Sequence, residues 1–571
     1  MKSHFAIGAR GASAEIYNAG LITGYFALTD EGDTFINQSG GVLQTKKTSY
    51  FNGGADLFRN EAGGTVLAAT NPNAKETSSF VQLERFDNAG LISLQAGAAG
   101  DTFRISNAAP PPGSKFFDSG LAFNASGNST LGVDAFLGGP GSTSDTLIID
   151  GDVTGRTALT VNNLNFGTGV FNRVGIPVVF VGGNVNANAF FLSQPIDTGF
   201  FDYDLFFRPT GSGIFELRSF LGAGAFVLPQ LTTAAQDLWY AGSLTWFDRT
   251  ADLRVLLAGG AAPTAYGPTG SKLDDGGTPP GAVPAVWARG SGSWLYRDDS
   301  ETVTAYGRTY QYNLDRELET IDFQVGLDLG RRDVLGSGDI LVFGALGGFV
   351  HGDLDYDQIA RGFDLSGGQV GGYATYLNGG MFVDTLLNVH FLEVDANGTL
   401  GFPGSLDATT LGLRTDAGYR FGSFTGGAFI EPLATIAVTW ADIDGFSLGG
   451  NTVSFDDDAN VRGRLGLRAG TSYPVWTSTV MEPFVIGSVW GNLSGDTNNA
   501  TLVSSGTAFL LNDQLDDVWG EVSAGVNFFN FGTGTTVFAR STSPSATISR
   551  ASAAKPACGS PGSRSSTTSS W

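Results

Sequence analysis

Ile321-Asp322-Phe323-Gln324-Val325-Gly326-Leu327-Asp328-Leu329 is the stretch that decides the fold of the second half of this chain. Its odd positions are all large and apolar, and its even positions are polar or glycine. Because successive side chains of a β-strand point to opposite faces, this alternation predicts a strand with one apolar and one polar face. A strand of a soluble β-sandwich gives the same alternation, so one run alone does not separate the two architectures.

The number and length of such runs favour a membrane β-barrel over a sandwich. Similar runs occur near residues 286–296, 338–351, 367–378, 380–394, 407–421, 424–440, 459–475, 479–492 and 517–530. In the run that ends at Trp440, Ile430 and the other even residues form one apolar face, Glu431 and Thr435 lie on the opposite face, and Leu433 is the exception. An apolar outside with a polar inside is the pattern of a barrel in lipid.

Tryptophans fall at the ends of several predicted strands. Trp287, Trp440, Trp490 and Trp519 occupy such positions. Aromatic side chains at the two membrane interfaces form a girdle around membrane proteins, so we expect these four to face the lipid interface. No apolar run reaches the roughly 18 residues that a membrane-spanning helix requires. This does not exclude a membrane, because a β-barrel spans it with strands of about 10 alternating residues.

The first third of the chain repeats a different phrase. Asn18, Asn37, Asn60 and Asn88 each follow a short apolar run and precede a Gly turn and a second apolar run. Their spacing of about 20 to 28 residues is typical of a solenoid, in which stacked rungs supply the core that one rung lacks. Gly and Asn suit the corners because both tolerate positive φ. A loose Gly/Asn-rich sandwich is the alternative; we favour a right-handed parallel β-helix.

An ordered set of segments then closes this region. It consists of Ser144–Gly151, Thr157–Asn163, Ile176–Gly183 and Phe201–Phe206, after an inserted Pro-rich loop at 108–115. Together they resemble the end of the passenger of a bacterial autotransporter, a protein of type V secretion. The resemblance implies a region that caps the β-helix and promotes passenger folding, which agrees with the need to cover the last sheet edge.

Residues 231–257 change character and predict a helix. Leu238, Ala241 and Thr245 lie at three- and four-residue spacing, as do Leu244, Phe247 and Ala251. This segment resembles the one between passenger and barrel in many autotransporters; a plain spacer helix is the alternative. The Gly/Pro-rich residues 258–284 predict a linker. Some relatives cut themselves near this junction at an Asn-Asn pair, but residues 231–284 contain no Asn, so that mechanism is not supported.

The region from residue 285 resembles the autotransporter barrel domain. The resemblance rests on Ala285–Gly290, on Glu431-Pro432 and Glu482-Pro483, and on Gly520–Phe528. The fold it implies is all-β, with a right-handed parallel β-helix, a short α-helix and a roughly 12-stranded antiparallel transmembrane β-barrel. The expected domains are a passenger β-helix truncated at its N-terminus (1–135), an autochaperone-like cap (136–230), a helix (231–257), a linker (258–284), a barrel (285–540) and an out-of-frame tail (541–571).

The tail reads as a frameshift. Two more strands are expected after residue 530, but residues 541–571 are rich in Ser, Ala and Pro. When the third base of each codon is joined to the first two of the next, residues 540–563 can be reread as Val-Asp-Val-Thr-Phe-Gly-Asp-Asp-Leu-Glu-Gly-Phe-Gly-Gly-Lys-Ala-Gly-Val-Arg-Val-Ser-Trp and a stop. In the family such a strand, with its last aromatic residue, is the signal for the barrel-assembly machinery. A natural disordered tail is the alternative. Residues 564–570, before Trp571, lack apolar alternation, so the chain as written is expected to assemble poorly. The start, Met1–Phe5, lacks a signal-peptide core, so the chain as written is not expected to enter the secretion pathway on its own.

Composition argues against a nucleic-acid partner and excludes cysteine-based sites. The net charge of −23 argues against nucleic acid, since phosphate binding needs clustered Lys and Arg. The single cysteine, Cys558, excludes an internal disulfide framework and a cysteine metal site.

No motif carries recognisable chemistry, so we expect no catalytic, metal or cofactor site and no enzyme activity. His4, His351 and His390 are scattered, and we interpret His390 as a solvated residue of the barrel wall rather than a ligand. Gly32-Asp33-Thr34 and Gly100-Asp101-Thr102 read as rung turns. Asp456-Asp457-Asp458 could attract calcium, although an extracellular loop is the favoured interpretation.

The sequence therefore predicts an outer-membrane translocator that exports and anchors a β-helical surface passenger. The expected partners are the outer-membrane lipid bilayer, the barrel-assembly machinery if the C-terminus is intact, and a host or neighbouring cell surface, with the passenger outside the cell. The alternatives are an adhesin stalk and an anchor for a secreted enzyme encoded upstream.

Overall fold

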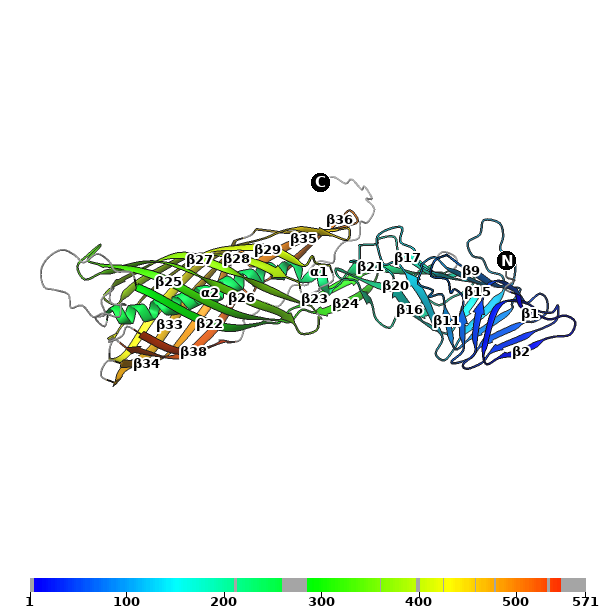
Figure 1. Cartoon of the computed structure of the whole chain (residues 1–571), viewed down its shortest axis with the longest axis horizontal. Helices are drawn as coiled ribbons and strands as arrows, with labels where there is room; N and C mark the ends of the chain where they lie inside the picture. Colours follow the sequence, from blue (N-terminus) through cyan, green and yellow to red (C-terminus); the bar gives the residue numbers. More distant parts are fainter. Residues whose placement is uncertain are drawn as a thin grey trace, which may run out of the picture. The chain divides into compact units, whose positions relative to one another are not determined.

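The computed structural model describes residues 5–209, 213–258, 285–359, 361–396, 401–424, 426–457, 459–476, 479–530 and 535–545. The chain divides into two compact units (Figure 1). The first comprises the residues up to Ala225 with Leu448–Asn451 and Val503–Thr507. The second comprises Phe226–Ser447, Thr452–Leu502 and the residues from Ala508 onward.

The first unit is a parallel β-helix. Its strands stack rung on rung in parallel pairs, for example β4 on β7 and β7 on β10 with Phe35, Phe58 and Phe86 in register. The strands are β1 Phe5–Gly8, β2 Glu15–Asn18, β3 Leu21–Ala27, β4 Thr34–Asn37, β5 Val42–Thr45, β6 Lys47–Tyr50, β7 Leu57–Asn60, β8 Thr65–Leu67, β9 Thr77–Val81, β10 Arg85–Asn88, β11 Leu91–Ser93, β12 Thr102–Ser106, β13 Leu121–Ala125, β14 Thr130–Ala135, β15 Thr146–Thr154, β16 Thr157–Asn163, β17 Ile176–Val181 and β18 Phe190–Phe191.

Stacked phenylalanines form the core of the β-helix. The rings of Phe35, Phe58, Phe86 and Phe123 follow one another with centroid separations of 5.2, 4.8 and 5.2 Å, and all four side chains are fully buried. A second row of buried rings, Phe51, Phe80 and Phe103, stacks beside the first, and Phe58 contacts Phe80 at 5.0 Å. The rings therefore pack both between rungs and within them.

The repeated asparagines form a buried ladder. Asn18 Nδ2 donates to Asn37 Oδ1, Asn37 to Asn60 and Asn60 to Asn88, each over 2.8 Å. The ladder then continues through hydroxyls: Asn88 donates to Ser129 Oγ at 2.7 Å, which lies 2.9 Å from Thr157 Oγ1. Because Ser and Thr replace Asn, the sequence repeat fades there although the rungs do not.

Parallel stacking therefore continues beyond residue 135, where the sequence suggested that the β-helix gives way to a cap. The parallel rungs reach β18, which pairs with β16. After it come β19 Ile196–Asp197, β20 Phe201–Pro209 and β21 Gly213–Leu221, of which β20 and β21 form an antiparallel hairpin. β21 also pairs antiparallel with β17, so the direction of pairing reverses at the end of the solenoid.

The second unit is built on an antiparallel sheet of eleven strands that surrounds a helix. In sheet order the strands are β22 Ala285–Arg297, β25 Arg316–Arg332, β26 Ile340–Tyr356, β27 Gly362–Asn378, β28 Met381–Asp395, β29 Ser405–Tyr419, β30 Gly427–Ile443, β33 Ala459–Trp476, β34 Thr479–Ser494, β37 Val518–Asn530 and β38 Thr535–Ser545. The connections carry the hairpin β23 Ser300–Ala305 and β24 Arg308–Asn313, and the small sheet of β31 Phe446–Leu448, β32 Asn451–Phe455, β35 Thr497–Ser504 and β36 Thr507–Gln514.

The structure confirms the faces predicted for β30. Ile430 and Trp440 are 51% and 41% exposed on the outer face, whereas Glu431 and Thr435 are buried inside. Leu433, the exception in the pattern, is buried in a cluster with Trp246 of the helix. The departure from alternation therefore marks a position where the wall packs against the helix.

The prediction of a lipid-facing girdle is wrong for three of its four tryptophans. Trp440 faces outward, but Trp287 donates its Nε1–H to Tyr373 Oη at 2.7 Å inside the barrel. Trp490 is 7% exposed and stacks on Trp519 at 6.0 Å. In their strands, each of these three tryptophans falls at one of the alternate positions whose side chains point inward. Their location near a strand end does not reveal on which face they lie. Among the tryptophans of the described barrel strands, Trp294, Trp440 and Trp476 face outward.

The short helix α1 Ala223–Phe226 spans the boundary between the two units. The long helix α2 Leu228–Ala258 follows in the second unit, so it starts before the predicted residue 231. Pro229 lies in the first turn of α2, where its missing N–H costs no hydrogen bond. Nearly all side chains of α2 are buried, on every side of the helix. Among the described residues, no helix is long and apolar enough to cross a membrane.

One strand, β38, follows residue 530 in the part of the chain that the structure describes, where the sequence predicted two. It extends to Ser545, past the residue 540 at which the predicted barrel ended. The reread residues 540–563 and the linker 258–284 lie outside the described residues except for Ala258 and 540–545.

Candidate functional site

The candidate site is the interior of the barrel, which α2 occupies (Figure 1). The helix contacts β22, β25, β26, β27, β28, β29, β30 and β37 of the surrounding wall. The helix therefore packs against the barrel wall along its length and is not only a spacer between passenger and barrel, which was the alternative interpretation of its sequence. Its side chains meet the wall through three zones, two of ion pairs and one of close packing.

The first zone lies near the start of α2 and centres on Asp237. This carboxylate accepts hydrogen bonds from Arg297 of β22 and Arg462 of β33, each over 2.8 Å. Tyr240, one turn later, donates to Asn460 at 3.1 Å, and the Arg462 guanidinium lies 3.9 Å from the Tyr240 ring centre. Two strands from different parts of the wall thus meet on one turn of the helix.

Close packing dominates the second zone. Trp239 is fully buried and donates its Nε1–H to the carbonyl of Asn388 at 3.1 Å. Gly412 of β29 leaves room for the indole, because a Cβ at this position would lie 2.2 Å from the Trp239 ring. The carbonyl of Gly242 accepts Gln324 Nε2 at 2.9 Å. The wall is shaped to the helix here.

In the third zone, near the end of α2, acidic and basic side chains of the helix alternate along the chain. Asp248 pairs with Arg540, and Arg249 with Asp328. Asp252 accepts Arg289 at 2.9 Å and Asn527 at 2.7 Å.

Two residues later, Arg254 pairs with Asp384 and lies 3.6 Å from Glu431. Removing one partner of such a buried pair leaves an uncompensated charge, which is costly. These pairs therefore fix the position of the helix even where they add little net stability.

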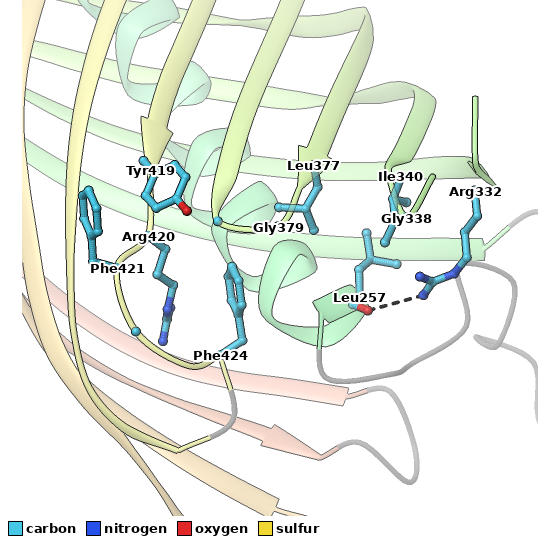
Figure 2. A pocket seen from close by; sticks show the side chains of 12 residues that line it. Leu257, Arg332, Gly338, Ile340, Leu377, Gly379, Tyr419, Arg420, Phe421 and Phe424 are labelled. Carbon is cyan, nitrogen blue, oxygen red and sulfur yellow. Dashed lines mark hydrogen bonds between the residues drawn. The ribbon is translucent and has the colours of Figure 1, made fainter. Parts of the chain in front are cut away.

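A recess of about 630 Å³ lies beside the last turn of α2 (Figure 2). Arg332 Nη2 donates to the carbonyl of Leu257 at 3.4 Å, and a cation at this end complements the helix dipole. Arg420 on the opposite side of the recess pairs with Glu482 at 2.7 Å. The aromatic rings of Phe421 and Phe424 complete its lining.

The choice of arginine as the cation of the barrel strands is a feature of the sequence that points to this buried ionic interface. Residues 285–545 contain no lysine, so every permanent cation of the barrel strands is an arginine. A planar guanidinium suits buried pairing with carboxylates better than an ammonium does. This composition, together with the acidic and basic residues of 237–254, could have indicated a buried ionic interface.

Histidines singled out in the sequence are not brought together. His390 is fully buried, 3.2 Å from Asn388 Nδ2 and packed near Gly242 of the helix, so its interpretation as a solvated wall residue is wrong. His351 lies on another strand, with its Nε2 3.1 Å from Asp353. His4 lies outside the described residues.

The aspartates of the predicted turns have a structural role. Asp33 is buried and accepts backbone N–H groups of Ala14 and Thr29, and Asp101 accepts that of Glu76. Asp456 and Asp457 lie in the connection from β32 to β33, and Asp458 lies outside the described residues. In the described part of the chain, no group of three His, Cys, Asp or Glu side chains could hold a metal ion.

Comparisons with known proteins agree with this architecture. Residues 286–541 match the model of the autotransporter β-domain, and residues 117–205 match the autochaperone domain of type 1. Residues 286–541 thus belong to the autotransporter β-domain family, and residues 117–205 to the autochaperone family. Autotransporter β-domains are outer-membrane proteins that export a passenger.

Among relatives, the chain is 31% identical over 138 residues to the probable autotransporter YfaL of Escherichia coli strain K12. This match covers 23% of the chain and 10% of that protein, so the chain spans about a tenth of the length of its curated relative.

The β-domain of the Bordetella autotransporter BrkA is similar at 22% identity, covering 45% of this chain and 91% of that one, with a TM-score of 0.32. The translocator domain of NalP from Neisseria meningitidis is 14% identical, covering 52% and 92%, with a TM-score of 0.31.

Proposed function

We propose that this chain anchors its β-helical passenger at the cell surface by keeping α2 inside the barrel after export. The observation that supports the proposal is the distribution of the helix contacts. Asp237, Asp252 and Arg254 pair with arginines or carboxylates of β22, β28 and β33. A helix held from several sides resists withdrawal, because every pair would have to lose its partner at once.

The chemistry of the interior supports a structural role for the helix. Its carboxylates and guanidinium groups pair with each other, and they are distributed along the helix rather than converging on one point. We therefore propose that the translocator itself has no catalytic activity. The outer face of the barrel contacts the lipid of the bilayer, since Ile321, Phe349 and Phe391 expose apolar surface there.

A test of export and anchoring uses the full chain behind an added signal peptide in a Gram-negative host. Protease added to intact cells should remove the β-helix and leave the barrel, and the passenger should stay with the cells rather than enter the medium. Replacing Arg297 and Arg462 by Gln removes both partners of Asp237 and should loosen α2 in the barrel. More passenger should then be found in the medium, or more should be released by protease cleavage within α2. Arg59→Gln is the matched control, because the Arg59 side chain, on the β-helix, is 43% exposed. A β-helix that stays protected in intact cells, although the barrel shows heat-modifiable gel mobility and has therefore assembled, would refute export.

Adhesion by the β-helix is a second candidate function. Tyr17, Tyr50 and Phe136 expose aromatic surface on it, and aromatic side chains are enriched in binding surfaces. Binding of bacteria that display the full chain to host cells, compared with bacteria that display the barrel alone, tests it. Equal binding by the two strains would exclude adhesion. An enzyme encoded upstream would instead show its nucleophile motif in the preceding DNA.

A further inference from the structure

Arg464 of β33 is a buried cation that has no acidic partner among the described residues. Its side chain is 2% exposed, and its Nε donates to Ser488 Oγ at 3.0 Å. Neither Nη1 nor Nη2 has a hydrogen-bond partner in the described part of the chain, and no ion pair there involves this guanidinium. An arginine does not lose its proton in a protein, so another group has to compensate the buried charge.

The neighbouring arginines on the same face of β33 are paired. Arg462 donates to Asp237 at 2.8 Å, and Arg468 donates to Glu482 at 2.8 Å. Residues separated by an even number of positions share one face of a strand, so these arginines and Arg464 all point into the barrel. The barrel interior therefore supplies a carboxylate to each flanking arginine but not to Arg464.

Aromatic rings surround the Arg464 guanidinium. It lies 5.3 Å from the ring centre of Phe247 on α2 and 5.3 Å from that of Trp490 on β34. Ring faces attract a cation, but they carry no net charge, so they position the guanidinium without neutralising it. Arg414 also lies over Phe247, at 4.8 Å, and its charge is compensated by Asp416 at 2.7 Å. The surroundings of Phe247 thus retain one positive charge.

Glu521 is the alternative source of the compensating charge. Its Oε2 accepts the Nε1–H of Trp490 at 3.2 Å, and its Oε1 lies 3.9 Å from Arg540 Nη2. Both oxygens are therefore directed toward groups other than Arg464. The Glu521 side chain is also 15% exposed, so water can stabilise its charge without the help of a buried arginine.

We infer that Nη1 and Nη2 of Arg464 bind a small monovalent anion of the chloride type inside the barrel, beside Phe247 and Trp490. A single negative charge matches the single uncompensated positive charge, whereas a divalent anion would leave an excess charge in a desolvated place. The bound anion completes the set of ion pairs around α2. The inference concerns the charge balance of the barrel interior and does not depend on passenger export or anchoring.

The stability of the full chain in chloride tests the inference. The chain is folded in nonionic detergent micelles and incubated in urea with sodium chloride or with sodium gluconate, a bulky monovalent anion, at equal ionic strength. Heat-modifiable gel mobility then measures the fraction of folded barrel. An anion that binds only the folded barrel acts by mass action, so a tenfold rise in chloride above its dissociation constant should lower the equilibrium constant for unfolding about tenfold. Gluconate should have no such effect.

Arg464→Met removes the charge and keeps an apolar side chain. The stability of this variant should not depend on chloride, and in gluconate it should equal or exceed that of the unmodified chain, because no uncompensated charge is left. Arg468→Met is the matched control, since Arg468 points inward from the same strand but has a carboxylate partner. Its chloride dependence should equal that of the unmodified chain.

Bromide provides a second measurement that needs no variant. Crystals of the unmodified chain grown in sodium bromide should show an anomalous-scattering peak within hydrogen-bond distance of Arg464 Nη1 and Nη2. The lack of a peak there would overturn the inference. Equal stability of the unmodified chain in chloride and gluconate would also overturn it and would assign the compensating charge to Glu521. A chloride dependence that Arg464→Met retains would show that the anion binds elsewhere.

Discussion

The carboxylate of Asp237 lies 2.8 Å from the guanidinium of Arg462, although 225 residues separate them in the sequence. The same carboxylate receives Arg297 at 2.8 Å, so one aspartate of α2 connects the first strand of the barrel sheet to its eighth. All three groups are largely buried, with side-chain exposures of 4% for Asp237, 6% for Arg462 and 21% for Arg297. The position of the helix thus depends on pairs between groups that meet only when the barrel forms.

Replacing Asp237 by Ala should destabilise the helix-filled barrel by about 3 to 5 kcal/mol, because two buried guanidinium groups lose their partner. The temperature at which the barrel loses its heat-modifiable mobility should fall. Asp355→Asn, an exposed carboxylate on β26, is the control and should change little. An unchanged transition in the Asp237 variant would show that the pair does not hold the helix.

Gly412→Ala should loosen the packing of α2 against β29. The added Cβ would lie 2.2 Å from the Trp239 ring, and such overpacking costs about 1 to 3 kcal/mol. Protease sensitivity within α2 should rise, and the Trp239 emission should shift toward that of a hydrated indole. At Gly487 an added Cβ meets no atom within 4 Å, so Gly487→Ala should change stability by no more than about 0.5 kcal/mol. Equal effects of the two substitutions would contradict the close fit.

Asn60→Ala should destabilise the β-helix by about 1 to 3 kcal/mol. Asn60 accepts from Asn37 and donates to Asn88, so its removal leaves the buried Asn88 Oδ1 without that donor. Chemical unfolding of the β-helix in the full chain measures the change. Asn128→Ala, at an exposed turn between β13 and β14, provides the comparison. A midpoint that is the same in both variants would mean that the ladder adds no stability.

Stability of the β-helix should decrease as pH rises from about 4 to 7. Burial raises the pKa of Asp56 to about 7 and that of Asp145 to about 7, from an ordinary 3.8. In that window the folded chain retains protons that the unfolded chain releases, so each unit of pH lowers the free energy of unfolding. Salt-bridged Glu76 and hydrogen-bonded Asp87 act in the opposite direction, because their pKa values are lowered and their contribution is lost at acid pH.

Asp56→Asn separates these contributions. This substitution removes one of the carboxyl groups whose pKa burial raises, so the loss of stability between pH 5 and pH 8 should become smaller than in the unmodified chain, as about one proton fewer is released on unfolding. Urea unfolding at several pH values measures it. An identical pH dependence of the two proteins would show that Asp56 ionises in the folded chain as it does in the unfolded one.

Much of this architecture could be predicted from local pattern. The alternation through Ile321–Leu329 gave the strand and its two faces, and the spacing of Asn18 to Asn88 gave the rungs. In both cases the signal is local, because the period of two residues and the repeat of one rung are set by backbone geometry. The helix at 228–258 was found from its spacing, though its role was not.

The sequence by itself therefore determined the element types, the inner and outer faces of most strands and the order of β-helix, helix and barrel. Only the tertiary structure decided that Trp287, Trp490 and Trp519 face the interior, that His390 packs against α2, and that Asp237 joins β22 to β33. These features depend on which strands become neighbours across the barrel, and long-range pairing of that kind leaves no periodic signal along the chain.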